Sequence, residues 1–168
     1  MSFDLPQILL IDDSRPDLDL VQEACSDAGV HAIFHLCHDG RDAIQFLTRP
    51  ALESVTLDLI VLDLFLPRTD GFSVLEFLQR SDHRLGEIPV LVLTGSGDMR
   101  HVERCFKLGA AFYLWKPAMY QDYTAIAHRI AELLHAPPRT PRPTPSLVER
   151  EDLMLNVHSP GRWAGLGG

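Results

Sequence analysis

The sequence lacks several features, and each absence excludes a class of protein. No apolar run approaches the roughly 20 residues that span a bilayer, so we expect no membrane segment. The N-terminal stretch carries no basic segment and no small-residue cleavage site, which argues against a secretory signal. The cysteines Cys25, Cys37 and Cys105 are odd in number and form no CxxC pair, so we expect buried thiols in a reducing cytoplasm.

Positive charge is also scarce in most of the chain. The formal net charge is −8, of which residues 137–168 contribute +1, so residues 1–136 carry −9. Nucleic-acid binding depends on clustered lysine and arginine side chains that neutralise phosphates, and this acidic body lacks such a cluster. We therefore expect no nucleic-acid partner, and instead a cation or a basic protein surface.

Short apolar runs alternate with longer segments of helical period, a pattern typical of βαβ units. Such runs are buried on both faces of a parallel sheet. We predict an α/β flavodoxin-like, doubly wound fold with strand order 2-1-3-4-5 and helices on both faces. The predicted strands lie at 7–11, 32–37, 59–62, 90–93 and 111–115, and helices begin near residues 14, 41, 71, 98 and 120.

The composition changes after the last predicted helix, which ends near residue 135. Five prolines fall within residues 136–145, and each lacks the amide donor that a helix needs. We therefore predict one domain over residues 1–136 and a flexible, proline-rich tail over residues 137–168.

Polar residues directly follow four of the predicted strands, namely Asp12, Asp13, Asp63, Thr94 and Lys116. In an open α/β sheet, ligands bind outside the carboxyl ends of the strands. Carboxylates about 5 Å apart would repel by about 3 kcal/mol per pair at an effective dielectric constant of 20, and a hard divalent cation is the simplest compensation. Mg²⁺ prefers such oxygen ligands, and a carboxylate beside Mg²⁺ and a lysine is a natural phosphoryl acceptor.

Four stretches of the chain resemble the response-regulator receiver domains of two-component signalling. They are ILLIDDS (8–14), VLDLFLPRTDGFSVLEFL (61–78), PVLVLTGSGD (89–98) and LGAAFYLWKPA (108–118). The resemblance covers about residues 5–136. It implies a stand-alone, cytoplasmic response regulator that accepts a phosphoryl group from a sensor histidine kinase and then changes its protein contacts. Its only chemistry would be self-catalysed phosphotransfer and dephosphorylation.

The resemblance also assigns roles to the residues at the strand ends. Asp63 matches the phosphoacceptor. Asp12 and Asp13 match the acidic pair that, with Asp63 and the backbone carbonyl of Phe65, holds Mg²⁺ (or Mn²⁺).

Further roles concern the switch between signalling states. Thr94 matches the switch hydroxyl, and Lys116 matches the lysine that contacts the phosphoryl group. The peptide bond between Lys116 and Pro117 is expected to be cis. Tyr113 matches the aromatic residue that rotates inward on activation.

Three finer features resemble the regulators of bacterial phytochrome histidine kinases. They are the pattern DLFLPRTDG (63–71), the long loop SDHRLGEIPV (81–90) and the absence of an output domain. The expected partner is then a red/far-red light sensor kinase. Phe65 departs from the polar asparagine usual in that subfamily, and we hypothesise that it hinders the water that hydrolyses the aspartyl phosphate.

A homodimer is also expected, through a face made by the fourth predicted helix, the fifth predicted strand and the fifth predicted helix. Tyr113 and Trp115 are expected to be exposed or semi-exposed there. Four residues of the last predicted helix are expected to add apolar area: Ile126, Ile130, Leu133 and Leu134.

Other interpretations remain to be weighed. A haloacid-dehalogenase-like enzyme would need a DxD pair on the first strand, whereas Asp12 and Asp13 are adjacent. A phosphorelay intermediate and a phosphorylation-independent pseudo-receiver both stay open, although the latter would be expected to have lost an acid, Thr94 or Lys116. A metal site at His31, His35, Cys37 and His38 is less favoured than an ordinary edge strand, because side chains alternate along a strand.

Overall fold

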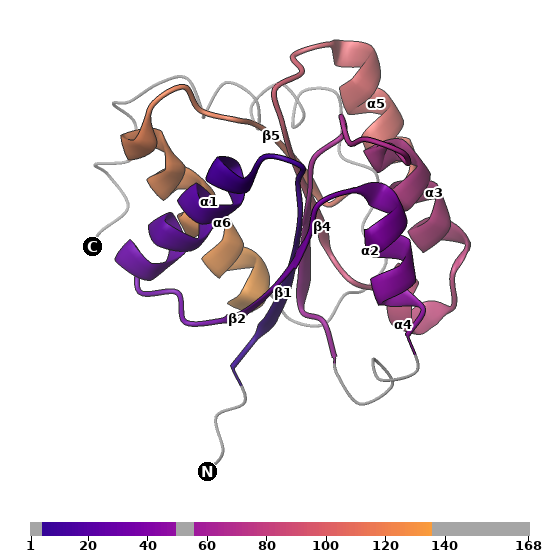
Figure 1. The fold of residues 1–168 in the computed structure, drawn as a ribbon, viewed down its shortest axis with the longest axis horizontal. Helices are drawn as coiled ribbons and strands as arrows, with labels where there is room; N and C mark the ends of the chain where they lie inside the picture. The colour runs from indigo at the N-terminus through magenta and orange to yellow at the C-terminus, as the bar shows by residue number, and fades with distance from the viewer. Residues whose placement is uncertain (1–4, 50–55, 136–168) are drawn as a thin grey trace.

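The protein is described by a computed structural model over residues 5–49 and 56–135. Within these residues, five parallel strands form one sheet in the order β2-β1-β3-β4-β5 (Figure 1), which confirms the predicted topology. The strands are β1 (Gln7–Ile11), β2 (Ile33–Cys37), β3 (Leu59–Leu62), β4 (Val90–Thr94) and β5 (Phe112–Trp115). The predicted tail over 137–168 lies outside the described residues, so the division into domain and tail stays a prediction.

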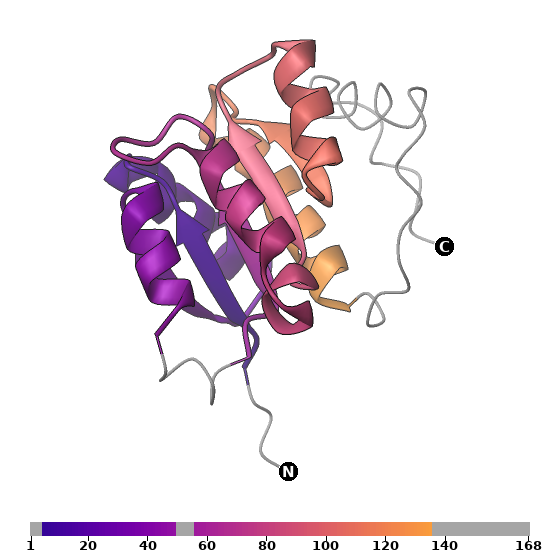
Figure 2. The same ribbon diagram turned by 90° about the vertical axis from the view of Figure 1, so that its right-hand side faces the viewer.

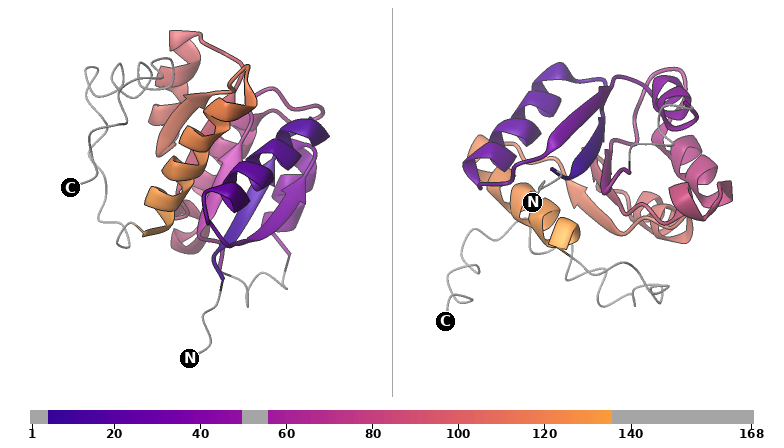
Figure 3. Two further views of the ribbon diagram at one scale, coloured as in Figure 1. Left: turned by 90° about the vertical axis from the view of Figure 1, so that its left-hand side faces the viewer. Right: turned by 90° about the horizontal axis from the view of Figure 1, so that it is seen from below.

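The helices cover the sheet on both faces, as predicted. They are α1 (Arg15–Asp27), α2 (Gly40–Leu47), α3 (Gly71–Arg80), α4 (His83–Gly86), α5 (Met99–Lys107) and α6 (Tyr123–His135), with a 3₁₀ turn, η2 (Tyr120–Asp122). Figure 2 shows α2, α3 and α5 on one face, and Figure 3 shows α1 beside α6 on the other. None of the helices within the described residues is long and apolar enough to cross a membrane.

Alternation of side chains along each strand divides the core into two apolar layers. On β1, Ile8 and Leu10 pack toward α1 and α6, whereas Leu9 and Ile11 pack toward α2, α3 and α5. All four side chains are buried, which explains why the strand is apolar from Ile8 to Ile11.

The first helix begins where local sequence signals place it. The hydroxyl of Ser14 accepts a hydrogen bond from the backbone N–H of Asp17 at 3.4 Å, and Pro16 lies in the first turn. Gly29 follows the helix with φ +73°, a conformation that glycine adopts without strain. The predicted start of this helix near residue 14 is therefore confirmed, and Gly29 follows its C-terminal end.

Two segments differ from the sequence prediction. The loop over 81–90 contains the short helix α4, which two hydrogen bonds to Asp82 stabilise. The backbone N–H of Leu85 donates to the side chain of Asp82 at 3.3 Å, and the backbone N–H of Gly86 donates to the carbonyl of Asp82 at 2.9 Å. The last helix starts as a 3₁₀ turn at Tyr120 and becomes α-helical only at Tyr123.

The cis peptide bond expected before Pro117 is absent. None of the peptide bonds in the described residues is cis, so the bond from Lys116 to Pro117 is trans. The trans form is the intrinsically favoured one for an X–Pro bond. In this conformation the backbone N–H of Lys116 donates to the carbonyl of Thr94 at 2.9 Å and continues the β-ladder.

The apolar face expected to mediate a dimer is not present as a continuous surface. Tyr113 is 1% exposed and packs in the core layer beneath α3 and α5, with the half-buried Trp115 on the same side. Ile126, Ile130 and Leu133 are buried in the opposite layer, and Leu134 is half-buried. The expected exposure was wrong for Tyr113, whereas Trp115 is half-buried. A periodic pattern shows which residues share a side, but not how deeply they are covered.

The three cysteines are buried free thiols, as expected. Burial raises the pKa of Cys25 and Cys105 to about 12 and that of Cys37 to about 11.

The loop between β3 and α3 is anchored against the start of α2. Arg68, which has φ +64°, forms an ion pair with the buried carboxylate of Asp39. A Cβ atom at Gly40 would lie 2.1 Å from the backbone oxygen of Thr69, so only glycine allows this approach. The anchoring matters because the same loop begins at Asp63.

We expect Gly40→Ala to destabilise the fold, because its methyl group would push the loop away from α2. The expected loss is about 2 kcal/mol in the free energy of unfolding, measured by urea denaturation. Gly95→Ala is the matched control, since no atom lies within 4 Å of a Cβ built there. Equal stability of the two variants would contradict a close-packed loop.

Candidate functional site

The carboxyl ends of the strands place four polar side chains at one edge of the sheet, the upper edge in Figure 1. Asp12 and Asp63 are the first residues after β1 and β3. The ladder extends to both, because the N–H of Asp12 donates to Cys37 at 3.1 Å and that of Asp63 donates to Ile11 at 2.9 Å. Thr94 ends β4, and Lys116 directly follows β5.

Three of the predicted metal ligands lie together. One carboxylate oxygen from each of Asp12, Asp13 and Asp63 falls within 4.8 Å of the others. Asp12 and Asp63 are buried, whereas Asp13 is exposed. A set of hard oxygen donors with one solvent-facing member fits a divalent cation such as Mg²⁺, which keeps several water ligands.

Lys116 is the positive charge at this edge. Its Nζ lies 2.7 Å from Asp12 Oδ2 and 2.8 Å from Oδ2 of both Asp63 and Asp17. Burial alone would lower the pKa of Lys116, but hydrogen bonds to these carboxylates outweigh it and raise the pKa above its ordinary value. The ammonium group is therefore charged over the whole physiological range.

Asp17 was not predicted to belong to the site. In the sequence it reads as an acid in the first turn of a helix, where it favours the helix dipole. The contact joins residues 99 positions apart, and an acid four residues after Asp13 was the only signal that could have indicated it.

The side chain of Thr94 has an unsatisfied group at this edge. The residue is fully buried, and its Oγ1 has no hydrogen-bond partner among the described residues. A buried hydroxyl without a partner is unusual and costs stability. From this position the hydroxyl could donate a hydrogen bond to an oxygen atom of a bound ligand.

Phe65 lies on the surface beside Asp63. Its side chain is 55% exposed, and its backbone N–H donates to Asp63 Oδ1 at 3.3 Å. The ring meets His101, on α5, edge-on with centroids 5.6 Å apart. The departure from a polar residue therefore places an exposed aromatic ring at the rim of the acidic cluster.

Tyr113 already points inward in this structure. Its hydroxyl donates to the carbonyl of Ser96 at 2.7 Å, and burial raises its pKa to about 12. Ser96 lies in the loop after Thr94, and its Oγ is 2.7 Å from Nδ1 of His101. The rotation of Tyr113 on activation stays a prediction, but the bond to this loop is formed.

Comparison with known proteins shows the family of this chain. The family model of the response regulator receiver domain matches residues 8–128. This chain belongs to that family.

Two curated relatives are similar to this chain in sequence. The chain is 37% identical over 139 residues to the "DNA-binding dual master transcriptional regulator RpaA" of Synechocystis sp., covering 82% of this chain but only about half (53%) of that protein. It is 37% identical over 118 residues to "Response regulator Rcp1" of the same organism, covering 68% of this chain and 79% of Rcp1.

Solved structures of two such regulators superpose on the receiver. The Mn²⁺-bound form of Rcp1 has a TM-score of 0.69 at 31% identity, covering 80% of this chain and 99% of that structure. The "Phosphorylated Cyanobacterial Phytochrome Response Regulator RcpA" has a TM-score of 0.71 at 30% identity, covering 82% and 99%. The flavodoxin-like receiver fold and the family resemblance are therefore confirmed.

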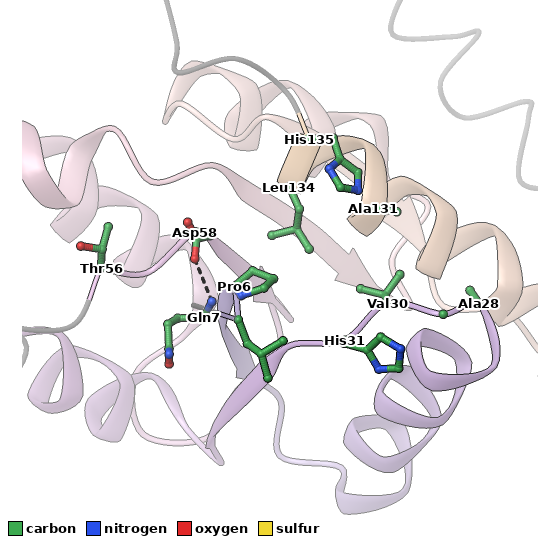
Figure 4. A pocket seen from close by; sticks show the side chains of 12 residues that line it. Pro6, Gln7, Ala28, Val30, His31, Thr56, Asp58, Ala131, Leu134 and His135 are labelled. Carbon is green, nitrogen blue, oxygen red and sulfur yellow. Dashed lines mark hydrogen bonds between the residues drawn. The ribbon is translucent and has the colours of Figure 1, made fainter. Parts of the chain in front are cut away.

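The histidines and Cys37 do not form a second metal site in the described part of the receiver. There, the acidic triad is the only group of three or more such side chains with suitably close ligand atoms. His35 instead contacts the side chain of Gln7 at 2.7 Å on the edge strand β2. His31 lines a cleft of about 880 Å³ at the opposite end of the sheet, where the carboxylate of Asp58 accepts a bond from the N–H of Gln7 (Figure 4).

The burial of charged Asp12 destabilises the folded receiver when no cation is bound. Burial raises its pKa, although Lys116 and the N–H of Ser14 oppose the rise. The folded state therefore binds this proton more tightly than the unfolded chain does. The contribution of Asp12 to stability is present below its ordinary pKa and is lost as pH rises through the folded value.

Asp12→Asn is accordingly expected to raise stability at neutral pH without Mg²⁺, by about 1 kcal/mol in thermal unfolding. Adding Mg²⁺ should stabilise the parent more than the variant. Asp19→Asn, which removes an exposed acid paired with Arg15 at 3.3 Å, is the control and should change neither quantity. A less stable Asp12→Asn protein would mean that the pair with Lys116 dominates over burial.

Proposed function

We propose that this receiver accepts a phosphoryl group on Asp63 from the phosphohistidine of a sensor histidine kinase, and that phosphorylation changes its contacts with other proteins. The observation that carries the proposal is the buried pair of Asp63 and Lys116, 2.8 Å apart, beside two further carboxylates and an unpartnered threonine hydroxyl. A pseudo-receiver is disfavoured because all of these groups are retained and gathered at one edge.

Asp63 and the metal ligands have different roles in the phosphoryl transfer. An oxygen of Asp63 forms a bond to phosphorus as the bond from phosphorus to the histidine nitrogen breaks, and the nitrogen keeps the electron pair. Mg²⁺ or Mn²⁺, held by Asp12, Asp13, Asp63 and the carbonyl of Phe65, would neutralise charge on the phosphoryl oxygens when bound.

Lys116 and Thr94 act on the product of this transfer. The ammonium of Lys116 pairs with the negative charge that the phosphoryl group brings to Asp63. The hydroxyl of Thr94 donates a hydrogen bond to a phosphoryl oxygen and so gains the partner that it lacks among the described residues. In this proposal, phosphotransfer to Asp63 and its dephosphorylation are carried out by these residues without a further catalytic group.

The loop after β4 connects the phosphorylation site with Tyr113 and His101. Thr94 stands at its start, and the carbonyl of Ser96, two residues on, accepts the bond from Tyr113. Movement of Thr94 toward a phosphoryl group therefore acts on the position of Tyr113 and of the neighbouring His101. Phosphorylation would shift the equilibrium between two arrangements of this loop.

The identity of the kinase rests on similarity. Rcp1 and RcpA are both near relatives in structure, and RcpA is described as a phytochrome response regulator. This supports a phytochrome-type photoreceptor kinase as the partner, in the cytoplasm. A role as a phosphorelay intermediate, passing the phosphoryl group onward, uses the same site. Homodimer formation rests on the family resemblance alone, since four of the six apolar residues expected at the interface are buried and the other two are half-buried.

The first test is intact-mass spectrometry after incubation with acetyl phosphate and Mg²⁺. We expect one phosphoryl adduct on the parent, none without metal and none on Asp63→Asn. Asp58→Asn is the matched control, because this aspartate precedes β3 whereas Asp63 follows it, and it should be modified like the parent. Absence of an adduct from the parent, together with no binding of beryllofluoride, would contradict the proposal.

The exposed ring of Phe65 is expected to prolong the phosphorylated state. An apolar side chain at the rim does not orient the attacking water, so Phe65→Asn should lose phosphate about tenfold faster than the parent. The decay of the adduct by mass spectrometry, after removal of acetyl phosphate, measures this rate. Phe65→Leu keeps an apolar side chain and should decay like the parent, and equal rates for all three proteins would refute the hypothesis.

A further inference from the structure

The ammonium group of Lys116 has more carboxylate partners than the phosphoryl transfer requires. An ammonium has three N–H donors, and three carboxylates lie 2.7 to 2.8 Å from Nζ. Asp12 and Asp63 belong to the acidic triad at the ends of β1 and β3, whereas Asp17 comes from the first turn of α1 and lies outside that triad. Resting Lys116 therefore has no donor to spare.

We propose that Asp17 is a positioning residue that competes with the phosphoryl group for Lys116 and so favours the unphosphorylated state. The proposal rests on the proposed function. Phosphorylation removes the carboxylate charge of Asp63 but adds about two negative charges nearby, which need the same ammonium. A fixed anion 2.8 Å from Nζ weakens that attraction and also repels the incoming charge.

The local structure holds Asp17 in this competing position. Its backbone N–H donates to the hydroxyl of Ser14, and the N–H of Ser14 donates in turn to Asp12 Oδ1 at 2.9 Å. The start of α1 is thus tied to the acidic cluster through the backbone as well as through Lys116. The side chain of Asp17 is 26% exposed and that of Lys116 is 16% exposed, so water screens the pair only in part.

The start of α1 does not need this contact in order to form. Ser14 caps the helix, and a carboxylate in the first turn is stabilised by the helix dipole wherever its side chain points. Asp19, two residues further along, pairs instead with Arg15 on the surface, where the two side chains are 58% and 70% exposed. The helix therefore offers two aspartates of equal charge, of which Asp17 contacts Lys116.

The test compares Asp17→Asn with Asp19→Asn, because each removes one negative charge from α1. Beryllofluoride, which occupies the place of a phosphoryl group on an aspartate, is titrated at a fixed Mg²⁺ concentration by calorimetry. We expect Asp17→Asn to bind roughly fivefold more tightly than the parent, and Asp19→Asn to bind like the parent. Asp17→Ser, a good residue for a first helical turn, should behave like Asp17→Asn.

A thermal melt of each protein separates this role from a structural one. Tighter binding of beryllofluoride by the Asp17 variants, with the gain shrinking at high salt, supports competition for Lys116. Unchanged or weaker binding by folded Asp17 variants, while the parent binds, overturns the inference and leaves the proposed function standing. A parent that neither binds beryllofluoride nor takes a phosphoryl group overturns both.

Discussion

The concentration of negative charge at the carboxyl edge of the sheet is the constraint around which the rest of the site is arranged. Parallel pairing of β1 with β3 places Asp12 and Asp63 on neighbouring strand ends, where both are buried. Buried carboxylates so close together oppose folding unless a positive charge faces them. Lys116 directly follows β5, which lies two places along the sheet from β3, and its single positive charge leaves the net charge of the site negative. A bound divalent cation would make the net charge at this edge less negative, and a dianionic phosphoryl group would make it more negative.

Direct contacts connect this charged edge to the surrounding elements. Asp17 ties Lys116 to α1, and the backbone of Phe65 joins Asp63 to the loop that leads to α3. Thr94 stands at the start of the loop whose Ser96 carbonyl accepts the bond from Tyr113. A change of charge on Asp63 therefore acts, through one or two contacts, on three segments: α1, the loop that leads to α3 and the loop after β4. These segments lie on both faces of the sheet.

Much of the fold follows from short-range patterns in the sequence. Largely apolar runs marked the five strands to within one residue at either end, and Ser14 marked the start of α1. The same patterns were less informative about how deeply each side chain is buried. Tyr113 and Ile126 were expected near a surface and are instead buried in opposite core layers, because a helix that packs over a strand covers it whatever the period of its side chains.

The sequence by itself determined the order of the elements and the polar residues at the ends of four strands, since both depend on patterns within a few residues. Parallel topology then requires Asp12, Asp63, Thr94 and Lys116 to share one edge. Only the tertiary structure decided that Asp17 joins Lys116 from 99 residues away and that the hydroxyl of Thr94 is left without a described partner. Those outcomes depend on how α1 packs against the sheet and how deeply the edge is buried, and neither is encoded in local periodicity.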